Sequence, residues 1–238
     1  MNRILFEPSE ISGGIARFGG ARARHVIDIL HGEAGQTIKT GEIDGPVGES
    51  VIEEISDGPE AMVSVRVDHY REAPRPWIDL VLAPPRPRVF KRLLPQFAAL
   101  GVGRIFLVGA KKVEKDFWGA TILREENYRP VLVEGLMQCG TTALPRIECR
   151  RNFRRFLSDE LDALFPEGER IVAHPAEDDA ADPVPGRPLL LAIGPEGGWT
   201  DDEVAELKSC GFRGYSLGPR ILRTDTAAIA LIARLMPR

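Results

Sequence analysis

The feature that most constrains the fold is a series of short apolar segments in the second part of the chain. From residue 78 onward, such segments alternate with longer stretches of helical character. The run 189–193, Leu-Leu-Leu-Ala-Ile, is apolar on both faces, and strands of this kind form parallel sheets covered by helices on both sides. An α/β domain is therefore predicted. Its expected strands are 78–83, 104–109, 171–173, 189–193 and 215–218.

The first seventy residues have a different pattern, because apolar and polar side chains alternate there in short segments separated by Gly, Asp and Pro. This alternation predicts a small antiparallel sheet or barrel. A helix is expected over 20–30, and residues 71–77, with two prolines, have the composition of a linker. The expected strands are 36–43, 47–55 and 61–70. Two domains follow, 1–72 and 73–238. In the second, a helix is expected over 88–100, where Pro95 should kink it or delay its start.

The composition excludes several classes of protein. The longest apolar run, 227–233, is too short to span a membrane, and the N-terminal residues lack the apolar core of a signal peptide. The cysteines Cys139, Cys149 and Cys210 form no CxxC pair, which favours reduced thiols over a disulfide framework or a zinc site. We therefore expect a cytoplasmic protein without a membrane segment.

The charge is unevenly distributed. The net charge is −4, but residues 86–155 hold 15 Lys and Arg against 6 Asp and Glu, and four of these arginines lie in 150-RRNFRR-155. Clustered positive charge attracts polyanions even when the whole protein is acidic. The alternative is a solvated basic face with no partner, and charge alone leaves both readings open.

The stretch 193-IGPEGGWT-200 follows an expected strand and contains a glycine turn. Gly197 and Gly198 permit positive φ angles and a close approach of the backbone to a ligand. Thr200 and Glu203 have the spacing of a capping box, so a helix should begin there.

The residues after this turn indicate what it binds. A phosphate-binding loop would continue with Gly-Lys-Ser/Thr, whereas Asp201 and Asp202 follow here and would repel a phosphate. A nucleoside-like ligand with little negative charge fits better, and S-adenosylmethionine, whose sulfonium is positive, is such a ligand. A tight strand–helix connection without a ligand remains the alternative.

A second Gly-Pro loop, 217-LGPRILRTDTA-227, lies close to the C-terminus. It contains Arg220 and Arg223, and a helix should begin near Thr226 with Thr224 or Asp225 as its cap. Two arginines at the mouth of a ligand loop suit the stabilisation of charge on a substrate. An ion pair with Glu196 is the alternative.

Together these motifs resemble the RsmE family of 16S ribosomal RNA uridine-N3 methyltransferases, within the SPOUT superfamily. The likeness rests on IGPEGGW at 193–199 and LGPRILRTDTA at 217–227, and it extends through AHP at 173–175 and LGV at 100–102. It covers nearly the whole chain. It implies a PUA-like β-barrel RNA-binding domain over 1–72 and a SPOUT methyltransferase domain with a C-terminal trefoil knot over 73–238. It also implies a homodimer, S-adenosylmethionine as cofactor, 16S rRNA or the small ribosomal subunit as partner, and no metal.

Roles for individual residues follow from the resemblance for the cofactor, from the chemistry of the reaction for catalysis, and from the clustered positive charge for RNA contact. The cofactor-binding residues would be His174, Pro175, Ile193, Gly194, Gly197, Gly198, Leu217, Gly218, Ile221, Leu222 and Thr226. Arg223, and after it Arg220, would stabilise the charge that develops on uracil, while Glu196 would accept a proton or orient an arginine. The RNA-contacting residues would be Arg3, Arg17, Arg22, Arg24, His25, Arg86, Arg88, Lys91, Arg92, Lys111, Lys112 and Lys115.

The chain departs from the family pattern mostly where RNA would be contacted. Residues 96–99 lack the usual lysine and glutamate, 138–141 lack the usual arginine, and His31 follows Leu30 where an arginine is usual. At 225–227 the change is only from Glu-Thr-Ala to Asp-Thr-Ala. Two alternatives therefore stay open, the same chemistry on another RNA and a non-catalytic cofactor-binding factor in ribosome assembly.

Overall fold

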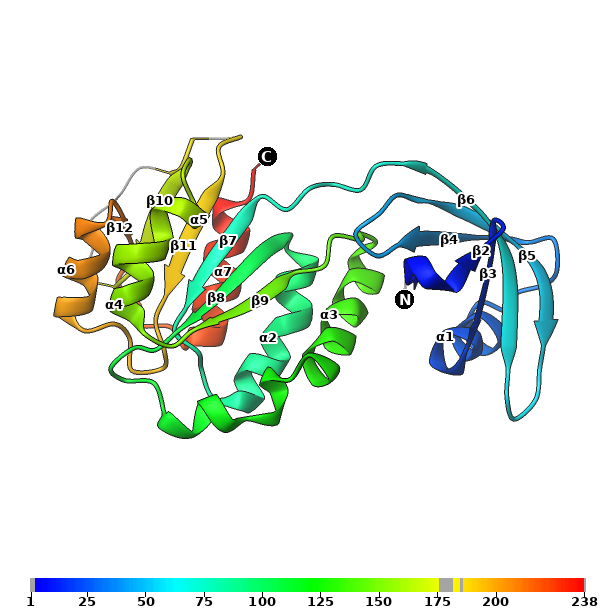
Figure 1. Cartoon of the computed structure of the whole chain (residues 1–238), viewed down its shortest axis with the longest axis horizontal. Coiled ribbons are helices and arrows are strands. Elements are labelled where there is room, and N and C mark those ends of the chain that lie inside the picture. The colour runs from blue at the N-terminus through cyan, green and yellow to red at the C-terminus, as the bar shows by residue number, and fades with distance from the viewer. Residues whose placement is uncertain (1–2, 176–181, 185, 238) are drawn as a thin grey trace. The chain divides into compact units, whose positions relative to one another are not determined.

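The computed structural model describes residues 3–175, 182–184 and 186–237. The chain folds into two compact units, which Figure 1 shows in ribbon form. One unit is Met1–Arg75 with Val133–Leu144, and the other is Pro76–Leu132 with Pro145–Arg238. The observed division after Arg75 lies close to the boundary expected after residue 72. The inclusion of Val133–Leu144 in the first unit was not expected, because a helical pattern does not reveal which core the end of a helix joins.

The first unit is built on a six-stranded sheet with the order β1-β4-β5-β6-β3-β2. The pair β1 and β4 is parallel, and the other ladders are antiparallel. Within the described part of the chain the sheet ends at β1 and β2, so the expected barrel is observed as an open, curved sheet (Figure 1). Its elements are β1 (Ile4–Phe6), η1 (Pro8–Glu10), β2 (Ile11–Ser12), β3 (Ile15–Gly19), α1 (Gly20–Arg24), η2 (His25–Ile29), β4 (Thr37–Glu42), β5 (Val47–Ser56) and β6 (Met62–Arg71).

The alternating pattern predicted three of these strands well. Strands β4, β5 and β6 lie within one or two residues of the expected segments, and the helix expected over 20–30 is observed as α1 continued by the π-helical segment η2. The short strands β1, β2 and β3 were not predicted. The core includes Phe6 and Phe18, whose ring centroids lie 5.4 Å apart.

The second unit contains a parallel sheet with the order β12-β10-β11-β7-β8-β9. Its strands are β7 (Ile78–Leu82), β8 (Val102–Val108), β9 (Arg146–Arg150), β10 (Glu169–Ala173), β11 (Leu189–Ile193) and β12 (Arg213–Tyr215). Its helices and helical turns are α2 (Pro87–Ala99), η3 (Lys115–Gly119), η4 (Thr121–Leu123), α3 (Glu125–Cys139, whose C-terminal part belongs to the first unit), α4 (Phe153–Arg155), η5 (Phe156–Glu160), α5 (Leu161–Leu164), α6 (Asp201–Ser209) and α7 (Thr224–Leu235).

Both faces of the parallel sheet are buried, as the apolar segments predicted. Val81 and Phe106 belong to a core cluster with residues of α4, η5, α5 and α6. Leu80 and Leu82, which alternate with Val81, are also fully buried. Helix α2 packs against β8 and α7, and its buried residues lie outside that cluster, so α2 and α7 belong to the other face. No helix in the described part of the chain is long and apolar enough to cross a membrane.

Three features of this unit differ from the expectations: the bounds of one strand, an additional strand, and the start of α2, which Pro95 does not delay. The strand expected over 215–218 is β12, which ends at Tyr215, because Gly218 and Pro219 continue into a loop. Strand β9 was missed because its side chains are largely charged, as suits the edge of a sheet. Helix α2 begins at Pro87, well before Pro95, because a proline in the first turn supplies the φ angle that a helix start requires.

Candidate functional site

The order of the parallel strands determines where a ligand can bind. From β7 the chain continues outward to β8 and β9, whereas β11, β10 and β12 lie on the other side of β7. The direction of winding therefore changes between β7 and β11. In open parallel sheets a ligand binds beyond the carboxyl ends of the strands at such a switch point.

The glycine turn after β11 is tightly closed. The Gly198 N–H donates to the Pro195 carbonyl at 2.8 Å, and Gly198 has a φ angle of 68°. A Cβ atom at Gly194 would lie 2.9 Å from the Trp199 nitrogen and 3.1 Å from the Gly198 carbonyl carbon. Both of these are backbone atoms that cannot move independently of the turn. Gly194 is thus required for close packing, and Gly198 for its backbone conformation.

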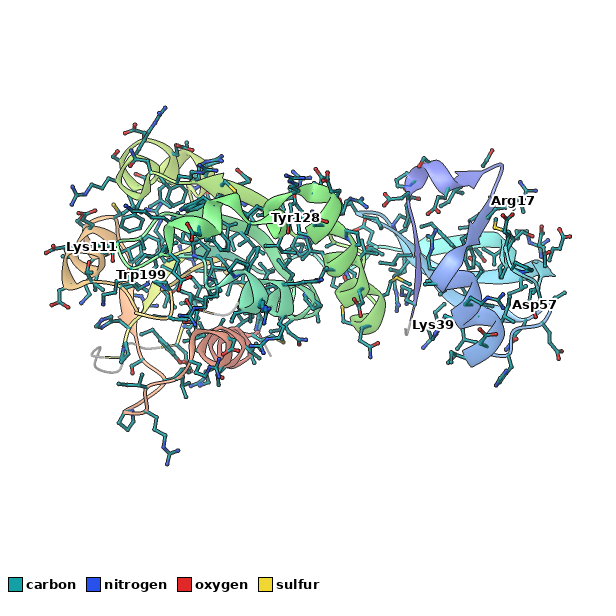
Figure 2. All side chains as sticks on the ribbon, turned by 90° about the horizontal axis from the view of Figure 1, so that it is seen from below. Arg17, Lys39, Asp57, Lys111, Tyr128 and Trp199 are labelled. Carbon is teal, nitrogen blue, oxygen red and sulfur yellow. The ribbon has the colours of Figure 1, made fainter. Side chains whose placement is uncertain are left out.

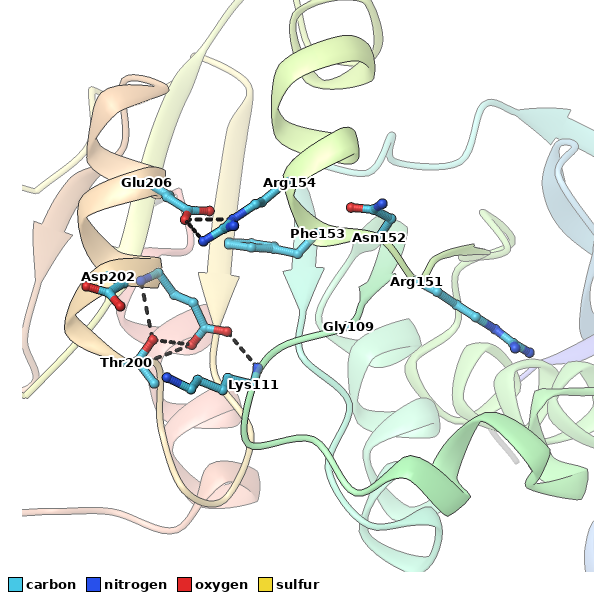
Figure 3. A pocket seen from close by; sticks show the side chains of 10 residues that line it. Gly109, Lys111, Arg151, Asn152, Phe153, Arg154, Thr200, Asp202 and Glu206 are labelled. Atoms are coloured by element: carbon cyan, nitrogen blue, oxygen red, sulfur yellow. Dashed lines mark hydrogen bonds and ion pairs between the residues drawn. The ribbon is translucent and has the colours of Figure 1, made fainter.

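The predicted capping box at the start of α6 is confirmed. The Glu203 N–H donates to Thr200 Oγ1, and Glu203 Oε2 accepts from the Thr200 N–H at 2.8 Å (Figure 3). Glu203 Oε1 also accepts from the Lys111 N–H at 2.7 Å, which holds the loop after β8 against the start of α6. Glu203 is only 8% exposed, so these bonds satisfy a buried carboxylate.

Two further contacts join the glycine turn to neighbouring loops. Glu196 Oε1 accepts a hydrogen bond from the Arg86 N–H at 2.9 Å, and this residue lies in the loop after β7. Lys112 Nζ donates to the Gly197 carbonyl at 2.8 Å, and the Lys112 side chain covers Gly197 so closely that a Cβ there would lie 2.9 Å from Lys112 Cδ. Glu196 therefore bonds the backbone N–H of Arg86, and not the side chain of Arg220 or Arg223 as the sequence had left open.

A cavity of about 430 Å³ lies beyond the carboxyl ends of β10, β11 and β12. Ten of the eleven residues expected to bind the cofactor line it, and they come from three separate loops. Thr226 does not line it and is exposed. The reason is that α7 begins at Thr224, with Arg223 as its N-cap, so Thr224 and Ala227 face the cavity instead. The expected cap by the side chain of Thr224 or Asp225 is not observed.

The comparisons with known proteins agree with this geometry. A family model described as an RNA methyltransferase domain matches residues 71–236. The Ribosomal RNA small subunit methyltransferase E of Treponema pallidum (strain Nichols) is 31% identical over 239 residues, 98% of this chain and 90% of the relative. The chain belongs to the ribosomal RNA small subunit methyltransferase E family.

Solved structures of similar proteins share the fold. Lpg2936 from Legionella pneumophila, solved in complex with the bound cofactor SAM, is 25% identical with a TM-score of 0.77, over 98% of this chain and 96% of its own. A Ribosomal RNA small subunit methyltransferase E from Neisseria gonorrhoeae, bound to S-adenosyl methionine, is 22% identical with a TM-score of 0.75, over 99% of this chain and 96% of its own. Because the Neisseria gonorrhoeae protein is only 22% identical to this chain, its likeness shows the fold alone.

The two arginines of the second Gly-Pro loop, 217–227, differ in position. Arg220 lines the cavity, whereas Arg223 does not. The Arg223 side chain is 80% exposed, and its Nε lies 3.9 Å from Asp225 Oδ1. Asp225 in turn accepts from Arg92 Nη2 at 2.6 Å. Within one chain, Arg220 is therefore the arginine closer to a bound ligand.

Of the residues predicted to contact RNA in the first unit, some form hydrogen bonds within the protein and others are exposed. Arg3 is 9% exposed and donates to the carbonyls of Thr40, Gly48 and Gly140. These bonds hold Arg3 inside the unit, and its contact with RNA stays a prediction. Arg17 is exposed, and its side chain points outward from the unit (Figure 2).

The remaining candidates of this unit are partly engaged. Arg22 donates two hydrogen bonds to Glu10, and they hold the pKa of that carboxyl below its usual range. Arg24 donates to Asp57 and to the Gly58 carbonyl. His25 is half-buried, and its Nε2 has no partner in the described part of the chain.

In the second unit all seven cationic candidates are exposed. Arg86 pairs with Glu114 at 3.0 Å, and Arg92 pairs with Asp225. Lys112 lines the cavity, so its position connects it with the cofactor site more directly than with RNA. Lys111 lies at the surface (Figure 2). The other three exposed candidates are Arg88, Lys91 and Lys115.

Sequence reasoning missed several residues that line the cavity, among them Ala173, Tyr215 and Ser216. All three lie at the carboxyl ends of β10 and β12, so the end of an apolar run is the signal that could have found them. Residues 176–181 of the loop after β10 lie outside the described residues. The described residues contain no group of three or more His, Cys, Asp and Glu placed to hold a metal ion.

Proposed function

We propose that the protein is an S-adenosylmethionine-dependent methyltransferase that methylates N3 of a uridine in 16S ribosomal RNA. The observation that carries this proposal is the cavity beyond the carboxyl ends of β10, β11 and β12, on one side of the switch point, which three loops line together. The family membership supports the reaction class.

The chemistry of the lining fits S-adenosylmethionine. A volume of about 430 Å³ lies within the range for small-molecule sites, roughly 300–1,000 Å³. Leu217, Ile221 and Leu222 offer apolar surface for an adenine ring, and the glycines offer backbone groups to its polar edge. The carboxylates of Glu196 and Asp201 also line the cavity. They disfavour a phosphate but suit the sulfonium and the ammonium group of this cofactor.

The reaction requires stabilisation of negative charge on the substrate. When bound, S-adenosylmethionine supplies an electrophilic methyl group. The N3 proton of uracil must pass to solvent water as the nitrogen attacks the methyl carbon, and negative charge builds on the two uracil carbonyl oxygens as the proton leaves. A guanidinium placed there stabilises that charge. Arg220 is placed for this role on the cavity wall, and Arg223 is sufficiently exposed to reach a substrate outside it. Holding the nitrogen in line with the methyl group supplies much of the acceleration.

Glu196 is best described as a positioning residue. Its carboxylate accepts the Arg86 N–H and so fixes the glycine turn against the loop after β7. This role needs a hydrogen-bond acceptor but no transferable proton.

We further propose features that the family resemblance implies. These are a PUA-like RNA-binding role for the first unit, a trefoil knot in the second, a homodimer, and a place in the cytoplasm with the small ribosomal subunit. Exposed apolar side chains beside the cavity support the homodimer, notably Ile221, which is 87% exposed, and Leu222, which is 37% exposed. A second copy that covers them would remove this surface from water. Sedimentation equilibrium that gives only monomer would contradict this part.

Two experiments test the function in sequence. Calorimetry with S-adenosylmethionine should show binding, and absence of binding at high micromolar cofactor would remove the enzyme proposals. Mapping of modified nucleotides should then show that 16S rRNA from a strain without this protein lacks one 3-methyluridine. If all such sites remain, the target is another RNA or the protein is a non-catalytic assembly factor.

The arginine roles are tested on the purified protein. Arg220→Ala should keep cofactor affinity within about threefold but lower the rate of transfer by roughly a hundredfold, as expected when a group that stabilises developing charge is removed. If the Arg220→Ala rate is unchanged, Arg223 would have this role, and Arg223→Ala measured in parallel would then show the loss of rate.

A further inference from the structure

A second hollow, of about 620 Å³, lies in the same unit beyond the carboxyl ends of β8 and β9. The two loops that form it touch, because a Cβ at Gly109 would lie 2.2 Å from the Arg151 carbonyl oxygen. Figure 3 shows Lys111 on one loop and the 151–154 segment on the other, with the start of α6 opposite. The basic sequence 150-RRNFRR-155, to which no role has been given so far, therefore lies beside the lysines that follow β8.

Arg151 differs from the other arginines of this segment. Arg150 pairs with Glu148 and Glu160, Arg154 with Glu206, and Arg155 with Asp159. The described residues offer Arg151 no carboxylate partner. Its guanidinium lies over the Trp118 ring, 5.3 Å from the centroid, and its Nη2 donates to the Trp118 carbonyl at 3.3 Å. The arginine is thus held in place by stacking while its charge stays uncompensated.

Two lysines lie on the loop that leads to Trp118; Figure 3 shows the Lys111 side chain extending toward α6, whereas Lys115 lies three residues before Trp118 in η3. Lys111 and Lys115 are exposed, and neither ammonium group has a recorded partner within residues 3–175, 182–184 and 186–237. Most carboxylates that line the hollow already have hydrogen-bond or ion-pair partners within the protein. Glu203 is satisfied by its hydrogen bonds, and Glu206 pairs with Arg154. Asp202 is the lining carboxylate for which no such bond is recorded. Figure 3 shows the Arg151 side chain pointing away from α6 and its carboxylates.

This surface is fixed to the wall of the cofactor cavity. The Phe153 ring stacks on Trp199, with centroids 5.5 Å apart and an interplanar angle of 25°. Trp199 directly follows the glycine turn and lines that cavity. On the other loop, the bond from the Lys111 N–H to Glu203 holds the backbone against α6. An RNA chain that places one nucleotide in the cavity would therefore contact a preformed basic surface beside it.

We propose that Lys115, Trp118 and Arg151 form a binding surface for single-stranded RNA next to the methylated nucleotide, an inference that rests on the proposed function. Lys115 and Arg151 would contact backbone phosphates, which attract clustered cations irrespective of sequence. The exposed face of the stacked guanidinium would also accept an unpaired base, extending the stack from Trp118. A paired duplex offers no free base face for this contact, so single-stranded RNA is the occupant that the stack favours.

The test measures binding of fluorescein-labelled oligouridylate by anisotropy over a series of salt concentrations. Arg151→Gln should weaken binding roughly tenfold and reduce the slope of log K against log salt by about 0.7, the value for one phosphate contact on a single strand. Arg155→Gln is the matched control, since Arg155 lies in the same segment, is exposed and lies 3.8 Å from Asp159. It should change affinity by less than about twofold.

A second variant separates charge from stacking. Arg151→Lys should keep the wild-type salt slope but bind several-fold more weakly, because lysine retains the charge and loses the planar stack. All three variants should bind S-adenosylmethionine as the wild type does, which shows that the cavity is intact. Equal effects of Arg151→Gln and Arg155→Gln, or an equal loss with an RNA duplex, would overturn the proposal while leaving the proposed function standing. Absence of cofactor binding in the wild type would instead remove the proposed function.

Discussion

The two Gly-Pro loops of the cofactor cavity are built in opposite ways. The loop at 193–200 is held by its own backbone, by the α6 capping box and by bonds from Arg86 and Lys112. The loop at 217–223 has fewer recorded bonds, chiefly those of Ser216 with Gly218. It leaves Leu217, Ile221 and Leu222 exposed.

This difference indicates a division of labour. The first loop is preorganised, so it can bind a ligand without losing conformational freedom. The second presents apolar and cationic side chains that gain contacts only when a cofactor, a substrate or a second subunit covers them. Substitutions in the first loop should therefore reduce stability and binding together, whereas those in the second should affect binding more than stability.

The largest effect is expected for Gly194→Ala. Its Cβ would meet backbone atoms of Trp199 and Gly198 at about 3 Å, so the turn must open. We expect a loss of about 1–3 kcal/mol in the free energy of unfolding and at least a tenfold loss in S-adenosylmethionine affinity, equivalent to about 1.4 kcal/mol. Urea denaturation and calorimetry measure the two.

The matched control in the second loop is Gly218→Ala. Gly218 has a φ angle of 101°, but a Cβ there would meet no atom within 4 Å. The cost should be limited to backbone strain of roughly 1 kcal/mol. If this variant proved as unstable as Gly194→Ala, the contrast between the loops would be lost.

An intermediate effect is expected at Glu196, where two substitutions distinguish positioning from proton transfer. Glu196→Gln keeps an acceptor for the Arg86 N–H and should retain transfer within about threefold, whereas removal of a general base would cost roughly a hundredfold or more. Glu196→Ala should lower cofactor affinity several-fold, in line with the net value of one hydrogen bond, about 1 kcal/mol. Single-turnover rates with saturating cofactor provide the measurement.

The smallest effect on stability is expected for Ile221→Ser. With 87% of the side chain exposed, the free energy of unfolding should change by less than about 0.5 kcal/mol. Cofactor affinity or dimerisation should nevertheless weaken, since both would bury this side chain. Calorimetry and sedimentation on the same sample provide the readings. A variant that loses stability but binds and dimerises normally would reverse the roles given to the two loops.

Much of the second unit could be predicted from the sequence. Four of its six strands contain the predicted apolar runs, and the capping box at Thr200 and Glu203 depends only on a three-residue spacing. Ten of the eleven residues predicted to bind the cofactor line one cavity, because the signature motifs lie in loops that follow strands. Thr226 does not line it, because α7 begins at Thr224 and turns Thr224 and Ala227 toward the cavity.

The sequence by itself determined much of the local structure: strands with alternating apolar residues in the first unit, strands apolar on both faces in the second, a glycine turn and a basic segment. Only the tertiary structure decided which of these meet. The partner of Glu196 is 110 positions away, and the partner of Glu203 is 92 positions away. The buried bonds of Arg3 likewise join segments far apart in the chain. Such contacts depend on strand order in a sheet, and hydrophobic periodicity specifies which residues are buried but not which strands become neighbours.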